Sequence, residues 1–283
     1  MTKLPLLLIV AACSHAPAIT AEEAALRRAE ASAAYDKKDW ATCARANLIA
    51  AQGPNRPLDA LYEAACCQAQ AGERDAALAT LGRAVDAGYI ELLFMQRDPD
   101  LGPLRDDARW QELVARIEHA PRRGHVNAEL EQIYVEDQLD RAGAFESLDM
   151  QAVATRDRVR RERTIAIVDG GGAVASLDFV HAAFVFQHGE GVADFERAHQ
   201  LAKRAAELDP ADDTAKWLAA AAKDRALMTE GKPQWYGTQF QVHDGKWVLY
   251  QVDPAITDAE RARWKVPPLA LAKKRAEIMS QAK

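Results

Sequence analysis

Glycine, proline and aromatic residues are scarce in this chain. Its 283 residues include only 15 glycines and 12 prolines, and aromatic side chains make up 7% of the total. Alanine is abundant instead, and alanine has the strongest intrinsic preference for helix. This composition argues against a large sheet and predicts an all-α or nearly all-α protein, long enough for two domains.

A large excess of one charge is also missing. The chain has 36 basic and 42 acidic residues, a net charge of −6 at pH 7 and a pI near 5.7. This balance gives no whole-chain attraction to nucleic acid. The basic run from Arg156 to Arg163 contains two acids and no aromatic residue, which is typical of a solvated helix face or of contact with lipid headgroups. We expect no nucleic-acid partner.

The signatures of several enzyme classes are absent. The chain has no serine or cysteine nucleophile elbow, no metal-ligand spacing and no dinucleotide fingerprint. The triplet Gly170-Gly171-Gly172 lacks the flanking residues of a phosphate-binding loop and is typical of a helix terminator. We therefore expect neither a metal nor a cofactor, while catalysis itself stays open.

The chain has no long apolar run, and its first one is short. Leu4 to Ala12 amounts to about ten residues, too few to span the ~30 Å core of a bilayer. The segment Val10-Ala11-Ala12-Cys13 resembles a bacterial lipobox, which implies export, cleavage and a lipid on Cys13. We predict that residues 1–20 are a signal peptide and tether of a periplasmic or membrane-anchored lipoprotein. The alternative is a cytosolic protein with an apolar start.

Cysteine is rare, with four residues in all. If a lipid occupies Cys13, then Cys43, Cys66 and Cys67 remain. In an oxidising compartment Cys43 could pair with Cys66 or with Cys67. Buried free thiols are the alternative, because cysteine packs well between alanine-rich helices.

The first half of the chain repeats itself. Residues 35–43 align with residues 69–77, a shift of 34 positions, and the same shift carries Ala31 onto Ala65 and Ala50 onto Ala84. This spacing and these small residues resemble the tetratricopeptide repeat, which implies antiparallel helical hairpins. The first copy departs from the pattern because Lys38 replaces the turn glycine that Gly72 supplies in the second.

A capping segment should close the repeats. Residues 98–110 are typical of such a cap, and Pro121 to Gly124 mark a boundary, which gives a repeat domain over 21–121 and a second domain over 122–283. Because a solenoid normally needs about three repeats to be stable, we expect the two repeats and the cap to pack against the second domain. The repeats could dock a protein or peptide, or they could serve only as a scaffold.

The second domain places polar residues on apolar helix faces. Over 127–145, Leu130, Ile133, Tyr134 and Asp137 share one stripe, and Arg141 follows Asp137 at the spacing of an intrahelical ion pair. The apolar helix over 177–187 ends at Gln187-His188, and His188 continues its core stripe. An imidazole there can exchange a proton near neutrality, or it can simply be a hydrogen-bonded core histidine.

A second helix, over 214–230, places Asp224 among apolar neighbours. A buried carboxylate needs a partner, and His188 or Arg141 are the candidates, because Arg225 points about 100° away on an ideal helix. The following connector from Gly231 to Gln239 is rich in amide and aromatic side chains. Alternation on both sides of Asp244-Gly245 predicts a β-hairpin near 239–252.

Four motifs in this half resemble, in order, an uncharacterised bacterial domain family without an assigned activity. They cover about residues 127–275: Asp137-Gln138-x-x-Arg141, Gln187-His188, Asp224-Arg225 and Gln234-x-Tyr236-Gly237-Thr238-Gln239. The resemblance implies that these residues form one site. The predicted ligand-binding residues are Asp137, Gln138, Arg141, Gln187, Arg225, Gln234, Tyr236, Thr238 and Gln239.

Two functions are compatible with these patterns. The first is an envelope-associated binding protein, in which the repeats dock a protein or peptide, the second domain recognises a polar ligand, and the lipid on Cys13 is the only membrane contact. The alternative is a hydrolase or transferase in which His188 and Asp224 perform acid–base chemistry and the Tyr236–Gln239 loop binds substrate. The alternative requires His188, Asp224 and Tyr236 to meet in one pocket.

Overall fold

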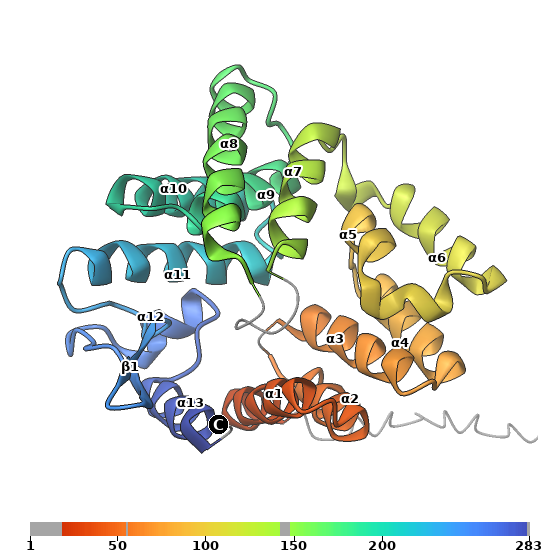
Figure 1. The fold of residues 1–283 in the computed structure, drawn as a ribbon, viewed down its shortest axis with the longest axis horizontal. Helices are drawn as coiled ribbons and strands as arrows, with labels where there is room; N and C mark the ends of the chain where they lie inside the picture. The colour runs from red at the N-terminus through yellow and green to blue at the C-terminus, as the bar shows by residue number, and fades with distance from the viewer. Residues whose placement is uncertain (1–18, 55, 142–147, 282–283) are drawn as a thin grey trace, which may run out of the picture.

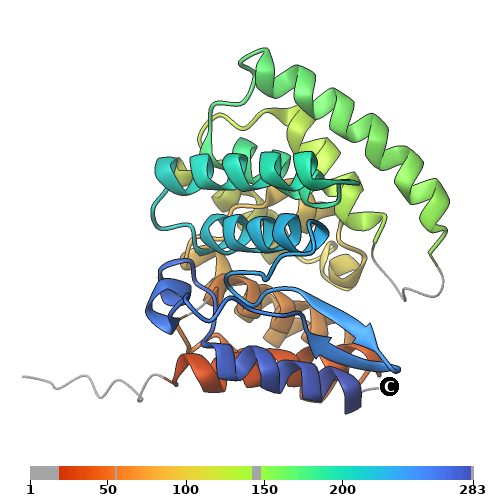
Figure 2. The same cartoon turned by 90° about the vertical axis from the view of Figure 1, so that its left-hand side faces the viewer.

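The computed structural model describes residues 19–54, 56–141 and 148–281. Within these ranges the chain consists of helices and one two-stranded antiparallel sheet near its C-terminal end. This confirms the expected all-α class with a small C-terminal hairpin. The elements follow one another around a closed arc, so that the first and last helices lie side by side (Figures 1 and 2).

The arc begins with two helical hairpins. They are α1 (Ala21–Asp36) with α2 (Trp40–Ala50), and α3 (Pro57–Gln70) with α4 (Arg74–Asp86). Lys38 and Gly72, which the 34-position shift superimposes, both adopt a positive φ, 56° and 79°, in the turns between the helices. The first hairpin therefore makes the same turn without glycine, although a side chain is strained there. Two consecutive helical hairpins with equivalent turns are thus present, which is consistent with a helical repeat.

A cap follows the second hairpin. It comprises α5 (Leu92–Arg97), the short 3-10 helix η1 (Pro99–Leu104) and α6 (Ala108–Glu118). Leu101 and Leu104 are fully buried, and Trp110 is 3% exposed, in the same hydrophobic core as Leu81 of α4. The cap therefore covers apolar surface of the repeat, and the 3-10 helix η2 (Pro121–Arg123) leads away from it at the predicted boundary.

Five helices follow the cap. They are α7 (Ala128–Leu139), α8 (Met150–Asp169), α9 (Ser176–Gln187), α10 (Val192–Leu208) and α11 (Asp213–Thr229). The predicted apolar helix is α9, which packs against the other four and buries most of its side chains. Gly170 caps α8 and Gly171 has a φ of 77°, as expected of a helix terminator. The sequence patterns did not predict α10.

The hairpin and two helices complete the arc. The strands β1 (Phe240–His243) and β2 (Lys246–Leu249) pair with Phe240 opposite Leu249. Asp244 and Gly245 both have positive φ, as a two-residue hairpin turn requires. After α12 (Asp258–Arg263), α13 (Leu269–Gln281) packs against both β2 and α1.

The two halves of the chain share an interface, as expected for so short a repeat. The imidazole of His181 on α9 is fully buried, and its Nε2 lies 2.8 Å from Oε2 of Glu91 at the cap. His181 also stacks on Tyr134 of α7, with ring centroids 4.4 Å apart. Elsewhere the guanidinium of Arg56 lies 4.4 Å from the ring of Trp217 on α11. Polar and aromatic contacts thus join the repeat to the second half.

The predicted signal segment lies outside the described residues up to position 18, which includes Cys13. The prediction of a helix as far as 145 is wrong, because α7 ends at Leu139 with Asp140 as its C-cap. Among the residues that the structure does describe, no helix combines the length and apolarity that crossing a bilayer requires.

Candidate functional site

Asp137 is the centre of a polar cluster at the end of α7. Its side chain is 1% exposed, and both carboxylate oxygens accept hydrogen bonds. Arg141 Nη1 donates to Oδ1 at 3.0 Å, and Gln138 Nε2 donates to Oδ2 at 2.8 Å. The other terminal nitrogen of Arg141 pairs with Asp157 of α8. The ion pair expected from the i, i+4 spacing therefore forms, and a second helix holds its arginine.

His188 approaches Asp137 from α9. It follows the last residue of that helix as its C-cap, and its Nδ1 lies 2.8 Å from Asp137 Oδ2. The side chain is 22% exposed. The core position predicted for His188 is wrong for this reason: the helix ends at Gln187, so the next side chain turns out of the buried stripe towards α7.

The partner of His188 determines where its proton lies. A carboxylate buried among donors is an acceptor, so the neutral imidazole carries its proton on Nδ1. Nε2 then has a free lone pair, and no side chain or backbone group of the described chain forms a hydrogen bond with it. The geometry gives His188 an oriented, partly exposed nitrogen that can accept a proton or bind a donor.

Arg225 joins the cluster from α11. Its Nη1 donates to the backbone oxygen of Gln187 at 2.6 Å, and its Nε donates to Oε1 of Gln239 at 3.2 Å. The guanidinium also lies 5.8 Å from the ring of Phe195. Burial, and secondly the positive charge of the nearby Arg141, lower the pKa of Arg225. We use "polar cluster" for Asp137, Gln138, Arg141, Gln187, His188, Arg225 and Gln239.

Gln187 contributes a buried amide to this cluster. The residue is 6% exposed, and its Oε1 has no hydrogen-bond partner among the described residues. An unpaired buried acceptor costs free energy. Gln187 Oε1 is one of eight such side-chain atoms in the described residues, so it does not by itself mark a site.

Asp224 is placed differently from what the sequence hypothesis requires. The carboxylate is fully buried and accepts four hydrogen bonds of 2.8–2.9 Å from the loop that follows α11. The donors are the backbone amides of Trp235, Tyr236 and Thr238 and the hydroxyl of Thr238. Burial raises the pKa of Asp224, and these hydrogen bonds act in the opposite direction. His188 pairs with Asp137, and Asp224 instead holds the loop on α11.

The remaining residues of the last motif are also internal supports. Gln234 is fully buried, and its side chain bonds the backbone of Gln239 and Tyr250 at 2.9 Å. Tyr236 is 5% exposed, and burial raises its pKa to about 12. These contacts leave Gln239 as the member of the motif that reaches the polar cluster, through Arg225.

Arg261 is a structural residue that the sequence patterns missed. Its side chain is 2% exposed and donates to the backbone oxygens of Trp235, Tyr236 and Ile256. The only hint in the sequence was its position three residues after Asp258, with which it pairs at 3.1 Å. Arg261 thus bonds the carbonyl oxygens of the same loop residues whose amides bond Asp224.

The arginines of α8 are neutralised by acids on neighbouring elements. Arg156 and Arg160 pair with Asp140, and Arg161 pairs with Glu190. Similarly, Arg158 and Arg163 have acidic partners. The expected solvated face is therefore only part of this run, because Asp157, Arg160 and Arg161 are buried among their paired charges.

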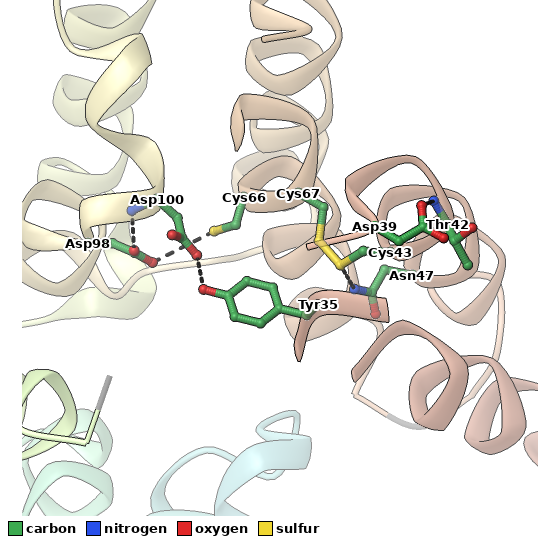
Figure 3. The surroundings of a disulfide bond; sticks show 9 residues. All are labelled: Tyr35, Asp39, Thr42, Cys43, Asn47, Cys66, Cys67, Asp98 and Asp100. Carbon is green, nitrogen blue, oxygen red and sulfur yellow. Dashed lines mark hydrogen bonds between the residues drawn. A yellow bond between two sulfur atoms is a disulfide. The ribbon is translucent and has the colours of Figure 1, made fainter. Parts of the chain in front are cut away.

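Cys43 of α2 and Cys67 of α3 form a disulfide (Figure 3). This is one of the two pairings that the sequence left open, and the Cα atoms are 5.9 Å apart. Cys66 is free, buried and directed towards the cap, with Sγ 3.7 Å from Oδ2 of Asp98. The bond therefore joins the second helix of one repeat to the first helix of the next.

Cys66, Asp98 and Asp100 are the group of potential metal ligands found in the described ranges. Their ligand atoms lie within 4.8 Å of one another. Asp98 accepts from the hydroxyl of Tyr62 at 2.7 Å and Asp100 from that of Tyr35 at 2.6 Å. Burial raises the pKa of the Cys66 thiol, which like the two tyrosine hydroxyls donates to these carboxylates, so the group already satisfies its own hydrogen bonds. It joins the cap to α1 and α3.

Two cavities lie away from the polar cluster. One, of about 310 Å³, is beside α2 and the turn before α4, and the other, of about 830 Å³, lies between β2 and α13. Neither is lined by a member of the cluster. The pocket shared by His188, Asp224 and Tyr236, which the enzyme hypothesis required, is therefore not one of these cavities.

The structure thus divides the predicted site residues into two groups. Asp137, Arg141 and His188 bond to one another directly, and Arg225 joins them through the backbone oxygen of Gln187, whereas Asp224 bonds to the Gln234–Gln239 loop. Arg141, His188 and Arg225 are the partly exposed members. Asp157 and Phe195, which contact Arg141 and Arg225 of the polar cluster, were not predicted. No protein-family model, curated protein or solved structure matches this chain, so its function must be inferred from this geometry.

Proposed function

We propose that this chain is an exported binding protein whose polar cluster recognises a small polar ligand. The observation that carries the proposal is that hydrogen bonds link four separate segments next to the partly exposed His188 and Arg225: the end of α7, the end of α9, Arg225 of α11 and Gln239 of the loop. Buried residues such as Asp224 and Gln234 fix the supporting loop in place. Such rigid support is how a protein pre-organises a binding site.

The Cys43–Cys67 disulfide supports the export part of this proposal. Structural disulfides persist in oxidising compartments and are rare in the cytosol. Together with the lipobox-like segment ending at Cys13, this bond favours a periplasmic or envelope-anchored protein, whose lipid on Cys13 is its contact with the membrane.

The repeat-like hairpins support a second role in docking a protein or peptide. They resemble tetratricopeptide repeats in their spacing, and the cavity of about 310 Å³ beside α2 has apolar walls from Ala44, Leu48 and Ile49. Arg45 lines the same cavity and has no carboxylate partner among the described residues. Such a surface fits a short peptide with one apolar and one acidic side chain.

An acid–base enzyme is the second candidate, and one observation favours it. Asp137 orients His188 in the way that a carboxylate orients the histidine of a catalytic dyad. In this version Asp137 takes the role first assigned to Asp224. Ligand binding and general-base catalysis both require an oriented imidazole at His188. Turnover of the bound compound distinguishes the two functions.

A thermal-shift screen tests the binding function. The wild-type chain is screened against organic acids, amino acids, sugars and nucleotides, beside His188→Gln and the control Arg163→Gln, whose guanidinium pairs with Glu129 far from His188 in sequence. A compound at about a hundred times its Kd should raise the Tm of the wild type and the control by roughly 5 °C. The His188→Gln protein should lose most of this shift. Equal shifts in all three proteins, or none with any compound, would contradict the proposal.

A further inference from the structure

Arg225 is unusual among the arginines of the described chain. The other described arginines without a carboxylate partner have more than a third of their surface exposed: Arg45, Arg83, Arg97, Arg105 and Arg275. Among these, Arg275 shares one property with Arg225, since burial lowers its pKa too. Arg225 is only partly exposed and is held by the uncharged groups of Gln187 and Gln239. A desolvated guanidinium is costly unless an anion accompanies it. The fold has thus placed an uncompensated positive charge in the polar cluster.

The neighbours of Arg225 do not neutralise its charge. Arg141 lies close enough to lower the pKa of Arg225, although its own charge is offset by Asp137 and Asp157. The one carboxylate of the polar cluster is fully engaged, because Asp137 binds Arg141, Gln138 and His188. Nothing among the described residues is therefore left to neutralise Arg225.

The geometry of the guanidinium leaves room for a ligand. Nε is directed to Gln239 and Nη1 to Gln187, while no hydrogen bond of Nη2 is formed with any described residue. A terminal guanidinium nitrogen donates to the oxygens of carboxylates and phosphates with charge-assisted bonds. The residue whose backbone oxygen Arg225 holds, Gln187, directly precedes His188, which ties both side chains to the C-terminal end of α9. A protonated imidazole can donate a second bond to an anion.

We propose that Arg225 binds the oxyanion of a small ligand, a carboxylate or a phosphate group, with His188 as the adjacent hydrogen-bonding partner. The inference rests on the proposed binding function and names its ligand class. Carboxylate and phosphate share the chemistry that Arg225 recognises, and the two probes below separate them.

The test uses inorganic phosphate and acetate as probes and sodium chloride as the reference at matched ionic strength. Binding to the full chain is measured by calorimetry and by thermal shift, for the wild type, Arg225→Gln, Arg225→Lys and the control Arg163→Gln. We expect one or both oxyanions to bind the wild type and the control with equal affinity. Arg225→Gln should weaken that binding at least tenfold, and Arg225→Lys, which keeps the charge but not the planar fork, should weaken it severalfold.

Two outcomes would overturn the inference. One is stabilisation of the wild type by neither oxyanion beyond chloride, and the other is the same affinity in the wild type and in the Arg225 variants. If Arg225→Gln does not fold, the Arg225→Lys comparison gives the answer. A neutral compound that needs His188 but not Arg225 would overturn the oxyanion assignment and leave the binding function standing, so the two failures can be told apart.

Discussion

Replacing Asp224 with alanine is expected to lower the free energy of unfolding by about 3–5 kcal/mol. The carboxylate is fully buried and accepts four hydrogen bonds from the loop after α11. Its removal leaves three backbone amides and one hydroxyl without an acceptor in a place that water reaches poorly. The cost is that of unpaired buried donors and not only that of the lost bonds.

Urea unfolding of Asp224→Ala and the wild type measures this change. Asp169→Ala is the matched control, because Asp169 is exposed and its ion pair with Arg197 lies on the surface. The control should lose less than about 1 kcal/mol. An Asp224→Ala protein as stable as the control would show that the loop does not depend on this carboxylate.

Loss of the Cys43–Cys67 bond is expected to lower the free energy of unfolding by about 3 kcal/mol. The bond closes a loop with a sequence separation of 24, and in the chain-entropy model it restricts the unfolded state by that amount. The double substitution Cys43→Ala with Cys67→Ala should reproduce the effect, since both positions are buried beside small side chains.

Addition of a reductant supplies the internal control for this prediction. Dithiothreitol should destabilise the wild-type protein and leave the double variant unchanged, because the variant keeps only the free Cys66 among the described cysteines. Equal stability of the oxidised and reduced wild-type proteins would contradict a stabilising role for the bond.

Local patterns in the sequence were enough to predict most of the helices. The periodicity of apolar residues gave the buried helix α9 and the stripe of α7, and Asp244-Gly245 gave the hairpin turn. The 34-position shift also identified the two equivalent turns at Lys38 and Gly72. These features depend on neighbours a few residues apart, which a single sequence shows directly.

The contacts of the polar residues could not be predicted in the same way. Periodicity showed correctly that Asp137 and Asp224 are buried, but not which elements face them. Asp224 bonds to the loop that follows α11, and His188, at the C-terminal end of α9, bonds to Asp137 of α7. Partners that are 51 positions apart, such as His188 and Asp137, depend on how the helices pack.

Within one sequence motif, one residue can stabilise the fold while its neighbour contributes to the candidate site. In the motif Asp224-Arg225, the aspartate anchors a loop while the arginine reaches the polar cluster. Adjacent residues on a helix point about 100° apart, so the two side chains face different surroundings. A substitution at Asp224 should consequently affect stability, and one at Arg225 should affect binding.

The tautomer of His188 tests most directly whether Asp137 orients its imidazole. Nitrogen NMR of histidine-labelled protein at about pH 8, above the ordinary histidine pKa of roughly 6.5, identifies the protonated ring nitrogen. The signal of His188 is assigned with the variant His188→Gln. The wild type should show a protonated Nδ1 and a bare Nε2, and Asp137→Asn should abolish this preference while Asp169→Asn keeps it. A protonated Nε2 in the wild type, or a tautomer unaffected by Asp137→Asn, would contradict the account.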